Sequence, residues 1–333
     1  TLHRHQMIGH RVTRIAALAA VIAALVLPSL AEAQTFPAKP VRIMVGSAAG
    51  GGTDIISRLL AQKLSEIWNQ QVIVENRVGA SATIAADFVA KSPPDGYHVV
   101  MAVPNSHTIG PFVMKNIPYD VVRDFTPITL AATVPHVLVV GLSVPANSMA
   151  ELVQAARANP GKLNFSSSGI GASQHMAGEL FNLVAGIKVV HVPYKGSADA
   201  MRDLIGGQVT LSFDTTASSI GQIRAGKLKA LAVASPKRAS ALPDVPTTAE
   251  AGFPGVEMIT WYGLFGPPNL PKAITDKWQQ DVARALALPD VRERIANLAG
   301  EPGGITPEAF GAFIRSELTR MQKLVKDANV QGD

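Results

Sequence analysis

A glycine-rich stretch at residues 46–54 (GSAAGGGTD) lies between a strand-like run at 41–45 and a run with helical spacing of apolar residues. Glycine lets the backbone approach a ligand closely, and the first N–H groups of a helix have no intrahelical partner. Such a strand, turn and helix present N–H groups to an anion, so we expect a carboxylate or a phosphate here. A flexible turn without a ligand is the alternative. The candidate binding residues are Ala48, Ala49, Gly51, Thr53 and Asp54.

The helix after this turn is predicted from apolar residues three and four positions apart, with Thr53 or Asp54 as its N-cap. The turn does not match a dinucleotide fingerprint, because the third glycine of G-x-G-x-x-G would fall within residues 53–56. No lysine follows Gly52, as a P-loop would require. Neither of these two phosphate-binding motifs is therefore present.

A second stretch, residues 166–173 (SSSGIGAS), repeats the pattern of strand end, glycine-containing turn and helix start. One such loop is weak evidence, but two loops in two α/β units predict two helix N-termini that converge on one anion or on both ends of a dianion. Each terminus would stabilise the anion by about 0.3–1 kcal/mol, or about 2 kcal/mol when partly buried. The candidates here are Ser168, Gly169, Gly171, Ala172 and Ser173.

Two further candidates, Asn105 and Ser106, follow the strand predicted at 98–103, and open α/β sheets bind ligands at the carboxyl ends of their strands. A solvated loop explains them equally well. Tyr194 also ends a predicted strand and offers a ring face and a hydroxyl to a cleft.

Three titratable candidates have competing interpretations. Asp54 would repel an anion, so a role in organising the loop by accepting backbone N–H bonds is favoured over a contact with a cationic part of the ligand. Asp214 ends the strand predicted at 209–213 and could accept a hydrogen bond from a ligand amine. His175 falls in the first turn of the second helix, where the helix dipole disfavours a protonated ring, so a neutral structural histidine is favoured over a ligand contact.

Alternating strand and helix patterns predict an α/β fold in which each of two domains is a doubly wound sheet flanked by helices, with the ligand cleft between them. Strands are expected at 41–45, 72–75 and 98–103, in a second set between 163 and 234, and at 260–265, followed by helices at 272–287, 291–299 and 307–328. The motif SMAE (148–151) is a capping box that starts another helix, and the last helix is expected to be capped by Thr306 with Pro307 at its first position. Domain 1 is predicted at 34–134 plus 258–333 and domain 2 at 135–257. Two crossings near 133–136 and 256–260 would suit a hinge.

The N-terminus resembles a signal peptide: three arginines precede an apolar run at 15–27, and Ala31 and Ala33 suit signal peptidase. The run of about 13 residues is short of the roughly 20 that span a bilayer. We expect residues 1–33 to be removed and the chain to be periplasmic. The absence of cysteine excludes disulfides, thiolate metal sites and a lipid-modified N-terminal cysteine.

Composition argues against other classes of partner. After loss of the leader, 27 basic and 24 acidic residues remain, they are scattered, and only 5% of all residues are aromatic, so nucleic acid is not expected. The motifs H-E-x-x-H, G-x-S-x-G and S-x-x-K are absent, and the eight histidines lie far apart in the sequence. We therefore expect no enzymatic activity, no metal and no cofactor. We also expect a monomer.

From about Pro37 to Ala328 the chain resembles the periplasmic solute receptors of tripartite tricarboxylate transporters, the Bug receptor family. The resemblance rests on AGGGTD (49–54), IPYD (117–120) with DFTP (124–127), SGIGASQH (168–175), HVPYKG (191–196), LPDVPT (242–247) with EAG (250–252), and WYG (261–263). Two departures are GSA at 46–48, where the family often has Pro-Phe or Pro-Tyr, and Met176, where leucine is usual.

The resemblance implies a two-domain, type II periplasmic-binding-protein fold that closes on a small carboxylate. It also implies that backbone amides and bridging waters of the two glycine loops hold this carboxylate, without an obligatory arginine. The expected function is capture of a di- or tricarboxylate, an aromatic acid or an acidic amino acid and its delivery to membrane permease subunits. The alternatives are a secreted enzyme that acts on a small carboxylate and a ligand-presenting partner of a membrane sensor kinase.

Overall fold

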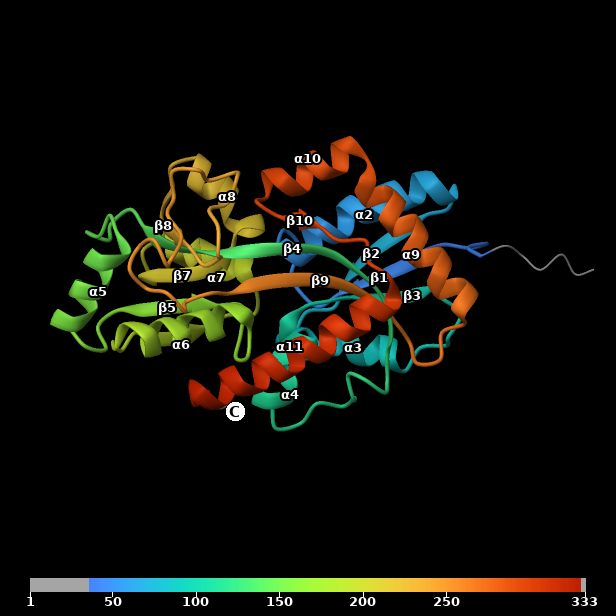
Figure 1. Cartoon of the computed structure of the whole chain (residues 1–333), viewed down its shortest axis with the longest axis horizontal. Coiled ribbons are helices and arrows are strands. Elements are labelled where there is room, and N and C mark those ends of the chain that lie inside the picture. The colour runs from blue at the N-terminus through green and yellow to red at the C-terminus, as the bar shows by residue number, and fades with distance from the viewer. Residues whose placement is uncertain (1–35, 331–333) are drawn as a thin grey trace, which may run out of the picture. The chain divides into compact units, whose positions relative to one another are not determined.

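The computed structural model describes residues 36–330, so the predicted leader at 1–33 lies outside the described residues. The elements from Lys39 onward belong to one compact unit (Figure 1). Its strands form a continuous mixed sheet in the order β2-β1-β3-β9-β4-β7-β5-β6, to which β8 and β10 are joined through β4. The predicted α/β class is confirmed.

The first group of strands surrounds β1 (Val41–Val45), which pairs in parallel with β2 (Val72–Asn76) and β3 (His98–Ala102). The crossovers contain α2 (Gly52–Trp68) and α3 (Thr83–Ala90). β3 leads into a short π-helical segment, Asn105–Ile109, and then into α4 (Gly110–Val113). This βαβαβ order agrees with the sequence pattern.

β4 (Thr126–Gly141) joins the two groups of strands. It pairs antiparallel with β9 (Ile259–Gly266) as far as Pro135, and from His136 it pairs with β7 (Leu211–Thr215). Figure 1 shows β4 and β9 side by side through the middle of the unit. The change of partner falls where the sequence predicted a domain boundary, but the division into two domains stays a prediction.

The second group contains β5 (Asn164–Ser167), which pairs in parallel with β6 (Val190–Pro193) and β7. β8 (Leu228–Val233) pairs antiparallel with β4. The helices of this group are α5 (Met149–Ala158), α6 (Ser173–Ala185), α7 (Ser197–Ile205) and α8 (Thr216–Arg224).

The tail returns through β9 and continues as α9 (Lys272–Ala287), α10 (Pro289–Asn297), β10 (Glu301–Pro302) and α11 (Pro307–Asp327). Thr306 caps α11 by accepting the Ala309 N–H, and Pro307 occupies its first position, as the sequence predicts.

The N-cap predicted for α2 is wrong. Gly51 is the N-cap, in an extended conformation, and Thr53 and Asp54 both lie inside the first helical turn. Gly51 has no side chain, so no side-chain cap accepts the N–H groups at the start of this helix. By contrast, Ser148 caps α5 by accepting the Glu151 N–H at 3.1 Å, as the capping-box pattern predicts.

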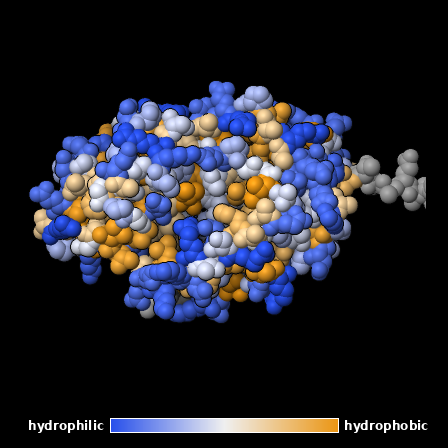
Figure 2. Space-filling view, viewed as in Figure 1, coloured by the Kyte–Doolittle hydropathy of each residue, from blue (hydrophilic) through white to orange (hydrophobic). Residues whose placement is uncertain are grey.

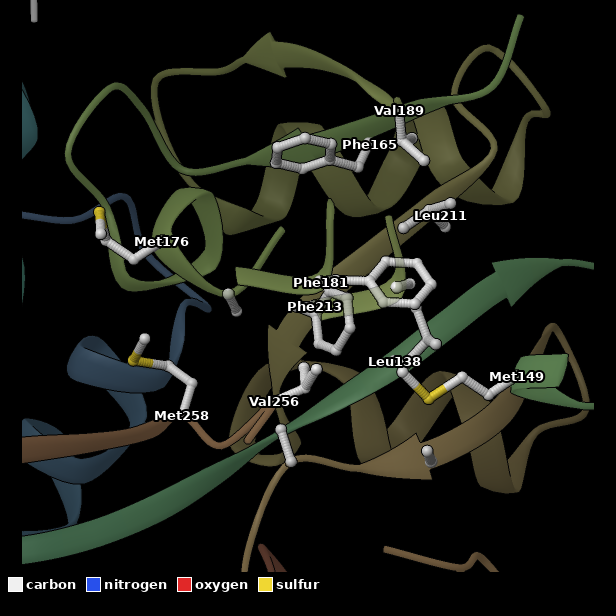
Figure 3. Packing of buried hydrophobic residues seen from close by; sticks show 14 of the residues in the cluster. Leu138, Met149, Phe165, Met176, Phe181, Val189, Leu211, Phe213, Val256 and Met258 are labelled. Carbon is white, nitrogen blue, oxygen red and sulfur yellow. The ribbon is translucent and has the colours of Figure 1, made fainter. Parts of the chain in front are cut away.

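Each group of strands has its own apolar core, and α11 packs into both. Phe310 and Ile314 of α11 pack in the cluster that contains Trp261 and Phe265. Met321 and Val325, further along the same helix, belong to the cluster whose aromatic centre, Phe165, Phe181 and Phe213, is shown in Figure 3. On the surface, apolar side chains form separate patches among polar ones on the face shown in Figure 2.

Candidate functional site

A cavity of about 850 Å³ is lined by both groups of strands. From the first group, the β1–α2 turn and the segments at 79–82 and 103–116 contribute. From the second group, the β5–α6 and β6–α7 turns and Thr215 contribute, and Thr260 and Tyr262 come from β9. Both glycine loops singled out in the sequence therefore lie at one cavity.

The start of α2 presents backbone N–H groups to this cavity. The first hydrogen bond within the helix runs from the Ile55 N–H to the Gly51 carbonyl, at 3.0 Å. The N–H groups before it have no intrahelical acceptor. Gly52 and Thr53, which carry two of these N–H groups, line the cavity.

Asp54 lies behind this turn and does not line the cavity. Its carboxylate accepts hydrogen bonds from the Gly50 N–H at 3.0 Å, from Arg58 Nε at 2.9 Å and from Asn76 Nδ2 at 2.9 Å. Burial acts to raise the pKa of Asp54, but these hydrogen bonds outweigh burial, so its pKa is lowered. The charged side chain thus organises the loop, and a ligand contact of Asp54 stays untested.

The start of α6 faces the same cavity, and a residue of the first group caps it. The first helical bond runs from the Met176 N–H to the Ala172 carbonyl, and the preceding Ser173 N–H donates to Asn105 Oδ1 at 2.9 Å. Asn105, which follows β3, thereby links the two walls of the cavity through this hydrogen bond. Gln174, the next residue of α6, also lines the cavity.

The structure brings together about half of the predicted site residues. Those that line the cavity are Gly51, Thr53, Asn105, Ser168, Gly169, Ser173 and Tyr194. Those that lie outside the lining are Ala48, Ala49, Asp54, Ser106, Gly171, Ala172, His175 and Asp214. Ser106 is buried, and its hydroxyl forms hydrogen bonds with the Val103 carbonyl and with His107 Nδ1. Whether any of these residues contacts a ligand stays a prediction.

Asp214 is 2% exposed and already has three donors. Its Oδ1 accepts from the Thr215 N–H at 2.8 Å, Gln174 Nε2 at 3.2 Å and Ser197 Oγ at 3.2 Å. Burial raises the pKa of Asp214. In this conformation the carboxyl group orients Gln174 and Ser197, both of which line the cavity, instead of facing a ligand amine.

Sequence reasoning missed a group of hydroxyls in the lining, those of Tyr262, Thr215 and Thr260. A Cβ placed on Gly52 would lie 2.5 Å from the Tyr262 hydroxyl and 3.0 Å from Thr215 Oγ1, so these groups lie directly against the start of α2. Burial raises the pKa of Tyr262, so its hydroxyl keeps its proton and is able to donate to an anion. In the sequence these strand residues look like ordinary core positions.

The charged residues of the lining are mostly basic. Lys115, Lys195, Arg202 and Asp199 line the cavity, and Arg202 forms an ion pair with Asp199 at 3.0 Å. Within residues 36–330 neither lysine forms an ion pair. The lysines come from opposite walls, after α4 and before α7, and their charge favours an anionic occupant.

Among the described residues no cluster of three or more histidine or acidic side chains is arranged to hold a metal ion. The same part of the chain contains no helix that is long and apolar enough to span a membrane.

The chain is similar in sequence and fold to known proteins. A model of the tripartite tricarboxylate transporter family receptor matches residues 56–330. R. palustris Rpa4515 with adipate is 36% identical with a TM-score of 0.88, and the periplasmic binding protein BugD is 36% identical with a TM-score of 0.85. For both, the match covers 90% of this chain and 100% of the other. MatC from Rhodopseudomonas palustris with bound malate is 30% identical with a TM-score of 0.83, over 87% of this chain and 100% of that one.

Proposed function

Since this chain belongs to the tripartite tricarboxylate transporter receptor family, we propose that it captures a small carboxylate and delivers it to the membrane permease subunits of such a transporter. The family resemblance read from the sequence and the type II periplasmic-binding-protein fold are both confirmed. The role as a solute receptor follows from the family. Delivery of the ligand to membrane permease subunits goes beyond this role and is our proposal.

We infer the class of ligand from one observation: the first turns of α2 and α6 line a single cavity. Their free N–H groups, the Tyr262 hydroxyl and the two lysines all favour a negatively charged occupant. The two similar structures with adipate and malate hold dicarboxylates. For this chain we favour a small dicarboxylate whose two ends meet donors on opposite walls.

The two walls suggest that binding closes the cleft. Asn105 and the start of α2 belong to the predicted domain 1, whereas Ser168 and the start of α6 belong to domain 2. A ligand that contacts both binds the closed form better and shifts the population towards it. The crossings at Pro135 and Met258 are the proposed hinge, and α11, which packs in both cores, would have to slide or bend during closure.

We place the protein in the periplasm, because its family includes a periplasmic binding protein and its leader has the features of a signal peptide. A binding role without catalysis is favoured because the family is a receptor family. The rival role, a secreted enzyme, predicts that the protein would convert the carboxylate that it binds.

Calorimetry with adipate and with adipic acid monoamide at pH 7 tests the proposal. Adipate should bind at least tenfold more tightly than the monoamide, a difference of about 1.4 kcal/mol in binding free energy. The monoamide lacks one of the two negative charges that the helix termini and the lysines stabilise. Neutral adipamide is the control and should bind more weakly than either. Equal affinities for the three compounds would refute the anion site, and recovery of a chemically altered adipate would support the enzyme instead.

A further inference from the structure

Two imidazole rings stack behind the loop that precedes α6 and lines the cavity. The ring centroids of His175, on α6, and His191, on β6, are 3.8 Å apart, and the planes differ by 7°. Phe165 of β5 extends the stack, with its centroid 4.9 Å from that of His191. Neither histidine lines the cavity, and His175 is only 6% exposed.

His175 holds one end of the loop. Its Nδ1 accepts the Gly171 N–H at 3.2 Å, so Nδ1 carries no proton and the neutral ring carries its proton on Nε2. Gly171 has a φ of +71°, a left-handed conformation that glycine adopts without strain. The hydrogen bond therefore fixes the loop at the residue where its backbone turns.

His191 holds the other end through Ser167. The Ser167 hydroxyl lies 2.6 Å from His191 Nε2, donates to the Gly169 carbonyl at 2.9 Å and accepts the Gly169 N–H at 3.1 Å. Because the hydroxyl has only one proton, and the Gly169 carbonyl takes it, His191 Nε2–H is the donor to Ser167. Burial lowers the pKa of His191 to about 4, so near neutral pH this ring carries a single proton, on Nε2, and through Ser167 it anchors both backbone groups of Gly169.

Between these two anchors lie Ser168, Gly169 and Ile170, all of which line the cavity. On the other wall, Ser81 Oγ donates to the Ile170 carbonyl at 2.5 Å. Any displacement of Gly169 or Gly171 would move the loop relative to the start of α6. The position of the loop thus depends on two rings that a ligand need not touch.

Protonation would disturb this arrangement in two ways. A proton on His175 Nδ1 would face the Gly171 N–H, and a charge on either ring would lie buried against the other. In the described residues, the titratable groups that face the pair are the rings themselves and Glu179 of α6, 3.7 Å from His175 Nε2. Burial, with a contribution from His191, lowers the pKa of His175 to about 3, and burial lowers the pKa of His191 to about 4.

We propose that His175 and His191 form a positioning pair that sets the ligand-binding geometry of the loop at residues 168–171. This role rests on the proposed function, since the loop matters only if the cavity binds a ligand. The pair contacts no ligand itself. It acts by fixing Gly169 and Gly171, so a change in the pair should alter affinity without filling or emptying the cavity.

Two isosteric polar substitutions of His175 separate positioning from simple loss of a ring. His175→Asn places an amide oxygen near the former Nδ1 and keeps an acceptor for the Gly171 N–H. His175→Gln extends the amide towards the former Nε2 and leaves that N–H without its acceptor. Both variants lose the stacked ring, so they share any packing loss and serve as matched controls for each other.

The first readout is hydrogen exchange in the ligand-free protein, which is independent of the proposed function. Peptides that cover residues 168–172 should exchange at least fivefold faster in His175→Gln than in His175→Asn. The second readout is adipate affinity, which should fall at least tenfold relative to the wild type in His175→Gln and stay within about threefold of the wild-type value in His175→Asn. Equal exchange rates and equal affinities in the two variants would overturn the proposal.

The two hypotheses fail in different ways. If wild-type protein binds no adipate, malate or other diacid, the proposed function fails, while the exchange difference still tests the positioning pair. If wild-type protein binds adipate but the two variants behave alike in both measurements, the pair has no positioning role and the proposed function stands.

The matching substitution on β6 is His191→Gln, which keeps an N–H near the former Nε2 and should preserve slow exchange at Gly169. His191→Leu removes this N–H, so exchange at Gly169 should be faster in that variant.

Discussion

Gly52→Ala is expected to weaken adipate binding at least tenfold while the protein stays folded. The added Cβ would lie 2.5 Å from the Tyr262 hydroxyl and 3.0 Å from Thr215 Oγ1, so the hydroxyls that line the cavity must move away from the start of α2. The fold should tolerate the change, because alanine favours a helix over glycine by about 0.5–1 kcal/mol. Calorimetry and thermal unfolding measure the two effects separately.

The same substitution made in a Tyr262→Phe background tests this mechanism. Without the hydroxyl the collision is relieved, so Gly52→Ala should lose clearly less affinity there, and the double-mutant cycle should give a nonzero coupling. Gly50→Asn is the control in the same loop: a Cβ there meets nothing within 4 Å, and asparagine tolerates a positive φ such as the +82° of Gly50 better than most other residues with a side chain. A control variant that loses as much affinity as Gly52→Ala would show that the loop, not the contact with Tyr262, is responsible.

Acidification from pH 6.5 to pH 4 should lower the free energy of unfolding by several kcal/mol. Burial lowers the pKa of His107 to about 3 and that of His136 to about 4, and both side chains are fully buried. In the unfolded chain these histidines titrate near 6.5, so the unfolded state binds more protons as the pH falls through this range. Each unit of difference between the folded-state and unfolded-state pKa values corresponds to about 1.4 kcal/mol of stability. Above pH 6.5 the histidines are neutral in both states, so they should add no further pH dependence there.

Urea unfolding at pH 7.0, 5.5 and 4.5 measures this loss, and His107→Phe identifies its source. The His107 ring already packs against Phe125 and Phe265, and within the described residues its Nε2 has no hydrogen-bond partner. The variant should therefore lose less stability on acidification than the wild type. An identical pH dependence in the two proteins would contradict the assignment to buried neutral histidines.

The sequence predicts local elements well because their signals are local. The apolar periodicity of α2, the caps Ser148 and Thr306 and the glycine turns each depend on a few neighbouring residues. The full length of β4 was not predicted. The part that pairs with β9, residues 126–135, contains Pro127 and Pro135, which argue against a strand, and it forms by pairing with residues more than 100 positions away.

The site shows the same division between local and long-range information. Both glycine loops were found from sequence because strand, turn and helix follow one another. Tyr262 was missed as a site residue because its strand is apolar and only the tertiary fold brings its hydroxyl against Gly52. Asp214 and His175 were predicted from their places at a strand end and in a first helical turn, but those places do not determine which way a side chain points, and both are buried behind the lining.

A crystal structure of the protein with adipate most directly tests the central claim, that one cavity holds a carboxylate between the starts of α2 and α6. The account predicts that carboxylate oxygens lie within about 2.7–3.2 Å of backbone nitrogens in the first turns of both helices. Adipate bound outside this cavity, or held by residues from only one of the two walls, would contradict it.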